Sequence, residues 1–281
     1  MSVVEEDIFR DGSTTYYWAA RLFPRQVRAD VLRLYSFLRV ADDYVDSTPP
    51  KAHQFLALKQ HWQNATLDAH YDFTPSEDDT KDERVIKNII GLTQRHAFDQ
   101  AWVGAFWASM EMDLYNKQYP TLDASLEYVY GSAEVVGLMM AKIMGLSPEA
   151  YQAAKLQGRA MQWINFIRDL GEDIDRGRCY FPATDLADAG LPHLTRDMAK
   201  AHPAAFKKLI HTELGYYYEW QAQAREGMVH IPGMLRPALK TAVDMFDWTA
   251  KQVAKDPFVV LERPLKPSKR RVFIRGIRNL A

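Results

Sequence analysis

The sequence predicts an all-α protein with a single domain. Hydrophobic residues recur with helical spacing along nearly the whole chain, and no segment shows the alternating pattern of a strand or the signal of a hairpin turn. The chain contains no internal repeat and no linker that would divide it. We therefore expect one domain over residues 1–281, which is long enough to bury a substantial core.

The expected helices follow from apolar periodicity and from the Pro and Gly residues near their ends. Pro24 suits the first turn of a helix, and the polar, acidic residues 71–83 form a loop. Gly145 and Pro148 separate two long helices. The expected helices cover residues 24–46, 52–67, 84–96, 99–117, 122–144, 148–175, 203–227 and 232–254, with an irregular segment at 178–202.

Composition excludes several functional classes. A net charge of −1 argues against a nucleic-acid partner. The single Cys179 excludes a disulfide framework and a cysteine-ligated zinc site. Residues 2–12 lack the apolar core of a signal peptide, and the most apolar stretch, residues 135–146, is too short to cross a membrane. We expect a soluble, cytoplasmic protein.

Two acidic motifs lie in otherwise apolar, helical segments, residues 35–46 and 165–173, and Gln162 lies one turn before the second. In each motif the carboxylates recur every three or four residues, so they stack on one helix face. Like charges stacked in this way repel unless a cation neutralises them, and Mg²⁺ binds a few carboxylates together with substrate phosphates and water. The motifs therefore predict Mg²⁺ and a diphosphate site. The predicted metal ligands are Asp42, Asp43, Asp46, Asn165, Asp169 and Asp173.

Other side chains beside the motifs complete the predicted site. Tyr35 and Arg39 precede Asp42 by seven and three residues, so they share its side of the helix. Arg39 can donate two hydrogen bonds to a diphosphate. We expect the two motifs to face each other across an aromatic-rich cavity. Such a site suits a reaction in which diphosphate leaves an allylic carbon and a carbocation must be kept from water.

A third acidic segment shows how little the spacing means alone. Asp78–Asp82 has the same D-D-x-x-D pattern as Asp42–Asp46, but it lies between further charged residues and lacks apolar periodicity. It is typical of a solvated charge run. The helical context and the second motif are what distinguish Asp42–Asp46.

The chain also resembles the squalene/phytoene synthase family over nearly its whole length. The segments that carry the resemblance are Ser13–Tyr16 with Leu22–Pro24, Tyr35–Asp46, Tyr128–Gly137, and Gln162–Asp173 with Arg178–Pro182. The family implies an isoprenoid-synthase fold, with helices around a central apolar cavity and two or three Mg²⁺ ions. It also implies that two prenyl diphosphates, farnesyl or geranylgeranyl, condense head to head. The reaction passes through a cyclopropylcarbinyl diphosphate to a phytoene-, dehydrosqualene- or squalene-type hydrocarbon.

The resemblance further implies roles for individual residues. The residues expected to bind diphosphate are Ser13, Tyr35, Arg39, Gln162 and Arg263. Those expected to act in catalysis are Tyr35, Arg39, Tyr128, Arg168 and Tyr180, the last tyrosine and Tyr128 lining the cavity. Glu134 is a departure, because the family usually has a Gly there beside a prenyl tail. Pocket shape therefore depends on where the Glu134 side chain points.

The residues leave alternatives open. Asn165, Asp169 and Asp173 have the spacing of the metal-binding triad of class I terpene cyclases. Asp169 in place of Ser or Thr, together with Arg39 and Arg168, disfavours that class. Intact carboxylates in both motifs disfavour a catalytically silent homologue with an assembly or binding role. The sequence does not separate C15 from C20 substrates, and it favours a product formed without NADPH.

The C-terminal segment, residues 266–278, is strongly basic and contains no acidic residue. Its basic residues are Lys266, Lys269, Arg270, Arg271, Arg275 and Arg278. One hypothesis is peripheral contact with anionic lipid, and another is that the segment caps the diphosphate site. The alternative is a solvated basic tail.

Overall fold

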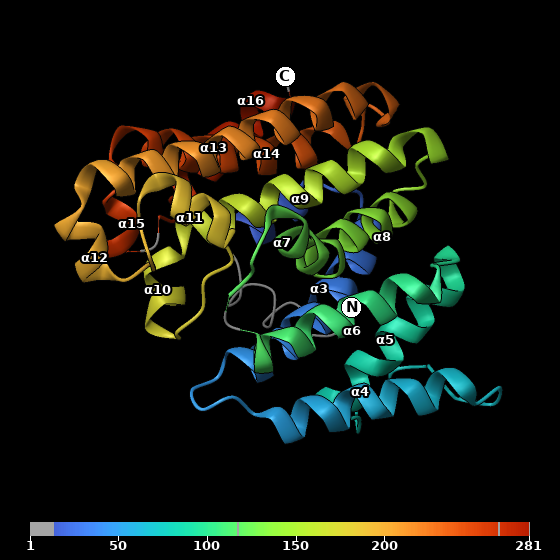
Figure 1. Ribbon diagram of the computed structural model, residues 1–281. Helices are drawn as coiled ribbons and strands as arrows, with labels where there is room; N and C mark the ends of the chain where they lie inside the picture. The colour runs from blue at the N-terminus through green and yellow to red at the C-terminus, as the bar shows by residue number, and fades with distance from the viewer. Residues whose placement is uncertain (1–13, 117, 264, 281) are drawn as a thin grey trace.

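The computed structural model describes residues 14–116, 118–263 and 265–280, and helices make up most of these ranges (Figure 1). The described residues form no β-strand; they contain one isolated bridge, between Tyr119 and Pro182. The prediction of an all-α fold is confirmed.

The first part of the chain builds a layer around α3. Its helices are α2 (Thr14–Ala20), α3 (Arg25–Asp46), α4 (Ala52–Leu67), α5 (Lys81–His96) and α6 (Gln100–Tyr115). The α3 helix packs against α4, α5 and α6 and buries Leu34, Phe37 and Val40, which recur at helical spacing. The α5 helix begins three residues earlier than expected, because Thr80 and Glu83 form a capping box.

The single helix expected at 122–144 contains a π-helical turn. It consists of α7 (Leu122–Val129), the π-helical η1 (Tyr130–Glu134) and α8 (Val135–Ile143). At Gly131 this turn approaches α6 so closely that a Cβ atom would lie 2.2 Å from the Ala105 carbonyl oxygen. Isolated π-helical turns occur frequently at functional sites.

The α9 helix (Tyr151–Arg168) lies at the centre of the fold. It follows the short η2 (Pro148–Ala150) and packs against α8, α13 and α14 (Figure 1). The helix expected at 148–175 is interrupted at Asp169, where the backbone leaves helical geometry before α10 (Leu170–Asp175). This break lies within the second acidic motif.

The C-terminal half forms the opposite layer. Its elements are α11 (Ala183–Ala189), α12 (Arg196–Ala201), α13 (Pro203–Glu226), η3 (Gly227–His230), α14 (Arg236–Lys255), α15 (Val259–Glu262) and α16 (Lys269–Leu280). In Figure 1, α13, α14 and α16 lie along the top and α4 lies along the bottom. The expectation that the last helix ends near residue 254 is wrong. The dense basic residues of 266–278 obscured the spacing of Val272 and Gly276, which α16 buries against its neighbours.

A buried carboxylate links α3 to α5. Asp30 is only 1% exposed and accepts hydrogen bonds from Arg33 Nη1 (2.7 Å), Arg95 Nη1 (2.5 Å) and His96 Nε2 (2.9 Å). Burial opposes ionisation, but these bonds outweigh it and lower the pKa of Asp30 below its ordinary value.

The Asp30 cluster gives a first prediction. Ionised Asp30 stabilises the folded state at pH values above the ordinary pKa of Asp. As pH falls toward the lower pKa of the folded state, Asp30 becomes protonated and this stabilisation is lost. We expect Asp30→Asn to lower the free energy of unfolding at neutral pH by about 1–3 kcal/mol. The loss should shrink below about pH 4. Urea unfolding at neutral pH and below about pH 4 measures this loss of stability. The control is Asp78→Asn, at an exposed residue. An equal loss at both would contradict a charge effect.

Candidate active site

An apolar pocket with one polar end lies among the central helices. Its cavity volume is about 360 Å³. Apolar lining residues include Ala19 of α2, Phe23 of the turn that follows it, Leu34 and Leu38 of α3, Phe106 of α6, Met140 of α8, Met161 of α9, and Ala238 and Ala242 of α14. A concave site of this kind can bury a long apolar ligand and exclude water from it.

The polar end of the pocket comes from both predicted motifs. The predicted site residues that line it are Tyr35, Arg39 and Asp42 from α3, Tyr128 from α7, and Gln162 and Asn165 from α9. These residues are far apart in the sequence, and the packing of the helices brings them together. The structure therefore places both motifs at one pocket.

In the first motif, the Arg39 guanidinium pairs with two carboxylates. Its Nη1 donates to Asp42 Oδ2 at 3.1 Å, and its Nη2 lies 2.7 Å from Asp43 Oδ1. Lys81 Nζ lies 3.8 Å from the other Asp43 oxygen. Desolvation inside the pocket, reinforced by the charge of Asp46, raises the pKa of Asp42 to about 7. The pocket thus holds a carboxylate that a further cation would stabilise.

The second motif is divided by the break after α9. Arg168 Nε donates to Asp169 Oδ1 at 2.8 Å, directly at the break. Asp173 lies one turn further on, in α10, and is buried. Burial, with the charge of Asp169, raises the pKa of Asp173 to about 8.

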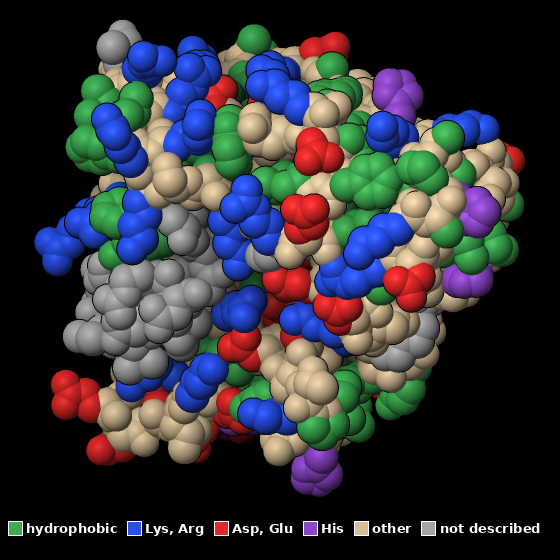
Figure 2. All heavy atoms as spheres, turned by 90° about the vertical axis from the view of Figure 1, so that its left-hand side faces the viewer, with side chains coloured by type: hydrophobic (Ala, Val, Ile, Leu, Met, Phe, Trp, Pro, Cys, Tyr) green, Lys and Arg blue, Asp and Glu red, His purple; other side chains and the backbone are tan. Residues whose placement is uncertain are grey.

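Two arginines beyond the second motif join it to the first. Arg176 Nη1 lies 3.7 Å from Asp46 Oδ2 and 3.8 Å from Asp173 Oδ1, so one guanidinium serves both motifs. Arg178 Nη1 donates to Asp46 Oδ1 at 2.5 Å, and its Nη2 donates to the Val45 carbonyl at 2.8 Å. Figure 2 shows acidic and basic side chains gathered around a hollow in the middle of the face of the molecule that it views.

The oxygen atoms at the polar end fit a hard cation that arrives with its ligand. Over the ranges that the structure describes, no three Asp, Glu, His or Cys side chains converge closely enough to hold a metal ion by themselves. Mg²⁺ commonly needs only one or two carboxylates, because substrate phosphates and water complete its shell. Asn165 Oδ1 is buried at this pocket without a hydrogen-bond donor. Such an acceptor, in a pocket that Asp42 also lines, suits a cation.

Asp113 is a buried acidic residue that was not predicted as part of the site. It accepts hydrogen bonds from the hydroxyls of Tyr128 and Tyr180, each at 2.7 Å. Burial raises its pKa, and the nearby Arg178 opposes that shift. The Tyr180 ring stacks on Phe166, with centroids 4.3 Å apart. Asp113 therefore fixes the aromatic layer behind the pocket. Its position on the buried face of α6 was the available signal.

The Glu134 side chain does not line the pocket. It is 1% exposed, accepts from Arg159 Nε at 2.6 Å, and lies 3.4 Å from Lys155 Nζ. Its neighbour Ala133 lines the pocket instead. The Glu134 side chain therefore points away from the pocket, and its carboxylate pairs with cations of α9.

Seven of the predicted residues that the structure describes do not line the pocket. Five of them form the ion pairs described above: Asp43, Asp46, Arg168, Asp169 and Asp173. Ser13 lies outside the described residues. Arg263 is exposed directly after α15 and is not among the lining residues. Tyr180 is buried in the layer with Tyr128 rather than in the lining itself.

Comparison with known proteins gives a consistent result. A family model described as squalene/phytoene synthase matches residues 9–272. A 15-cis-phytoene synthase from Enterobacter agglomerans is 34% identical over 264 residues, which is 86% of this chain and 79% of that protein. A presqualene diphosphate synthase from Sinorhizobium fredii is 32% identical over 179 residues, covering 63% of this chain and 61% of its own.

Solved structures show the same architecture. A crystal structure of a dehydrosqualene synthase in complex with a ligand matches with a TM-score of 0.80 and 22% sequence identity. The match covers 98% of this chain and 94% of that one. At this identity the likeness establishes the fold, and the isoprenoid-synthase fold implied by the sequence is confirmed.

Asp113 yields a second prediction. In Asp113→Asn, the amide offers one acceptor oxygen to two tyrosine hydroxyls, and Arg178 loses a nearby negative charge. We expect the free energy of unfolding to fall by about 1–3 kcal/mol, measured by denaturant unfolding. The exposed Asp78→Asn should change little. Equal stability of Asp113→Asn and the original protein would contradict an anchoring role.

Glu134 and Ala133 yield a third prediction, because Glu134 pairs with α9 whereas its neighbour Ala133 lines the pocket. Glu134→Gln should cost about 1–3 kcal/mol of stability by weakening the hydrogen bond from Arg159, and should leave the length of apolar ligand that the pocket accepts unchanged. Ala133→Leu adds volume to the pocket wall and should shift acceptance to shorter tails. Thermal unfolding and product masses measure the two effects. A change in product length with Glu134→Gln would contradict the assignment.

Proposed function

The chain belongs to the squalene/phytoene synthase family, a family of prenyltransferases, and from that premise we propose that it joins two prenyl diphosphates head to head. The observation that carries the proposal is the pocket itself. Residues of both acidic motifs lie at its polar end, and apolar helix faces form the rest. A prenyl diphosphate has the same division, with a charged head and an apolar tail.

The proposed reaction begins at the polar end. Asp42, Asn165 and the carboxylates of Asp46 and Asp173 would hold Mg²⁺, which when bound neutralises the charge developing on the departing diphosphate. Arg39 would donate two parallel hydrogen bonds to diphosphate oxygens, with Tyr35 beside it. In the structure Arg39 pairs with Asp42 and Asp43, so substrate must compete for its guanidinium.

The apolar pocket would then control the cation. After the C1–O bond of one substrate breaks, its C1 bonds to C2 and C3 of the second substrate, and a proton is lost. This gives a cyclopropylcarbinyl diphosphate, which ionises in turn and rearranges to a 1-1′ linked hydrocarbon. The pocket wall excludes water, which would otherwise capture the cation. Tyr128 would present an electron-rich ring, held in place by Asp113.

We propose a phytoene- or dehydrosqualene-type product, in which the last cation loses a proton and NADPH is not needed. The phytoene synthases among the relatives support this choice. Farnesyl and geranylgeranyl diphosphate differ by one isoprene unit, so product mass identifies the substrate directly.

The fourth prediction tests this function. We expect purified protein with Mg²⁺ and one of the two substrates to give an extractable hydrocarbon with twice the carbon number of the substrate. The reaction should not need NADPH, and EDTA should abolish it by chelating Mg²⁺. Mass spectrometry of the extract measures it. Asp42→Asn should lower kcat roughly 100- to 1,000-fold, by analogy with loss of one electrostatic contact in other enzymes.

The control for Asp42→Asn is Asp78→Asn, which alters an exposed acid of the same D-D-x-x-D spacing outside the pocket. It should leave kcat unchanged. An unextended product would contradict head-to-head condensation and favour a terpene cyclase. Full activity of Asp42→Asn would contradict the proposed diphosphate site.

A further inference from the structure

An exposed apolar stripe runs along α16. The buried residues of this helix, all of which the structure describes, are Val272 and Gly276. The exposed apolar side chains are Phe273 (62% exposed), Ile274 (42%), Ile277 (53%) and Leu280 (61%). Phe273, Ile277 and Leu280 recur at i, i+4 and i+7, so they share one side of the helix next to the buried residues, and Ile274 lies beyond them. A contiguous apolar surface of this kind marks an interaction site more often than a solvated one.

Positive charge borders the stripe. Lys266, Lys269, Arg270 and Arg278 are exposed, and no acidic residue occurs between 265 and 280. Figure 2 shows Lys and Arg side chains beside hydrophobic ones at the upper left of its view, where α16 lies. An apolar stripe flanked by Lys and Arg is typical of a helix that lies in the interface of an anionic membrane.

The inner side of α16 is fixed to the body of the protein. Arg275 Nε donates to Asp244 Oδ2 at 2.6 Å, and Asn279 Nδ2 donates to the same oxygen at 2.9 Å. The Arg271 guanidinium lies 4.6 Å from the Trp248 ring centroid. These contacts orient the helix, so the apolar stripe is held outward rather than free to turn inward.

The helices beneath α16 also form one wall of the pocket. The α16 helix packs on α2 and α14, and Gly276 lies close to Leu22, where a Cβ atom would be 3.3 Å from Leu22 Cδ1. Ala20 of α2 and Ala238 of α14 line the pocket. One layer of helices therefore separates the pocket from the exposed stripe.

We propose that α16 docks the protein on an anionic lipid surface, with Phe273, Ile277 and Leu280 entering the acyl boundary and the flanking Lys and Arg contacting phosphate headgroups. Charge complementarity favours this occupant. A second copy of the chain, related by two-fold symmetry, would set the same positive charges against themselves. No helix in the described part of the chain is long and apolar enough to span a bilayer.

Vesicle sedimentation of the full chain tests the proposal, using phosphatidylcholine alone and phosphatidylcholine mixed with phosphatidylglycerol. We expect binding to the anionic vesicles that weakens as salt rises. The double variant Arg270→Gln/Phe273→Ser should bind roughly tenfold more weakly, because it removes one charge and one inserted ring. Its circular dichroism spectrum should match the original, since both side chains are exposed.

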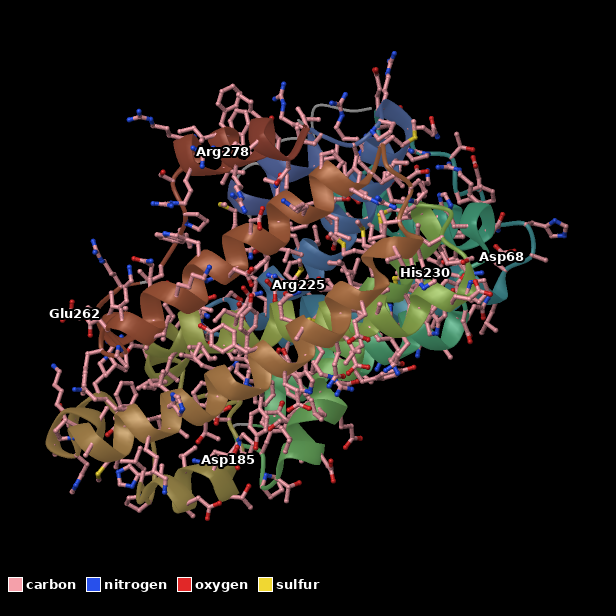
Figure 3. All side chains as sticks on the ribbon, turned by 90° about the horizontal axis from the view of Figure 1, so that it is seen from above. Asp68, Asp185, Arg225, His230, Glu262 and Arg278 are labelled. Carbon is pink, nitrogen blue, oxygen red and sulfur yellow. The ribbon has the colours of Figure 1, made fainter. Side chains whose placement is uncertain are left out.

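The matched control is Lys51→Gln/Leu67→Ser, which removes one exposed cation and one exposed apolar side chain at the ends of α4. Figure 1 places α4 at the opposite side from α16, and Figure 3 separates Arg278 from Asp68, the residue after Leu67. The control should bind vesicles like the original protein. That result, with weak binding of the α16 variant, supports the proposal.

Three outcomes would overturn the proposal. The first is binding that ignores both salt and anionic lipid, and the second is an equal loss in the control. The third is absence of vesicle binding together with a dimer, seen by light scattering, that Arg270→Gln/Phe273→Ser dissociates. In that case a second copy covers the stripe. Because the assay contains no prenyl diphosphate, its result is independent of the proposed function.

Discussion

The arrangement of this protein depends on holding several carboxylates close together where the two acidic motifs meet. Asp113 and Asp173 are buried and Asp42 and Asp46 are partly exposed; they come from three different stretches of chain and repel each other. Arginines make the arrangement stable. Arg176 approaches carboxylates of both motifs, and removing one member of such a set leaves the other charges less compensated. A bound metal ion would add positive charge beside these carboxylates, and a bound diphosphate would add negative charge beside these arginines.

That charge arrangement is tied to an aromatic layer. Arg178 reaches Asp46 and the Asp113 carbonyl, and Asp113 accepts from two tyrosines whose rings lie 5.0 Å apart. Groups already held in place need not reorganise when charge develops during a reaction. Tyr128 of this layer also lines the pocket. Under the proposed function, electrostatic stabilisation and water exclusion would therefore rely on one set of contacts.

The fold and the residues around the pocket's polar end could be predicted from the sequence. The side chains that pair with those residues could not. Helical spacing assigns Asp42 to the same face as Arg39, because that relation is local. It does not say which residue from elsewhere meets Asp46, so the role of Arg176 was not foreseen. The direction of Glu134 was also undetermined, since Arg159 and Lys155 belong to another helix. In α16, the dense basic charge favoured the interpretation of a basic tail, although Phe273, Ile277 and Leu280 recur at helical spacing in the sequence.

The two ends of the pocket hold substrate and product differently under the proposed function. Substrate is held by charge at one end and by apolar burial along the rest. Both diphosphates have left by the end of the reaction, so the product is held by apolar burial alone. Releasing it to water would expose that surface at about 25 cal/mol per Å², whereas transfer to lipid carries no such cost. A lipid-facing helix separated from the pocket by α2 and α14 therefore places the apolar acceptor next to the product's binding site.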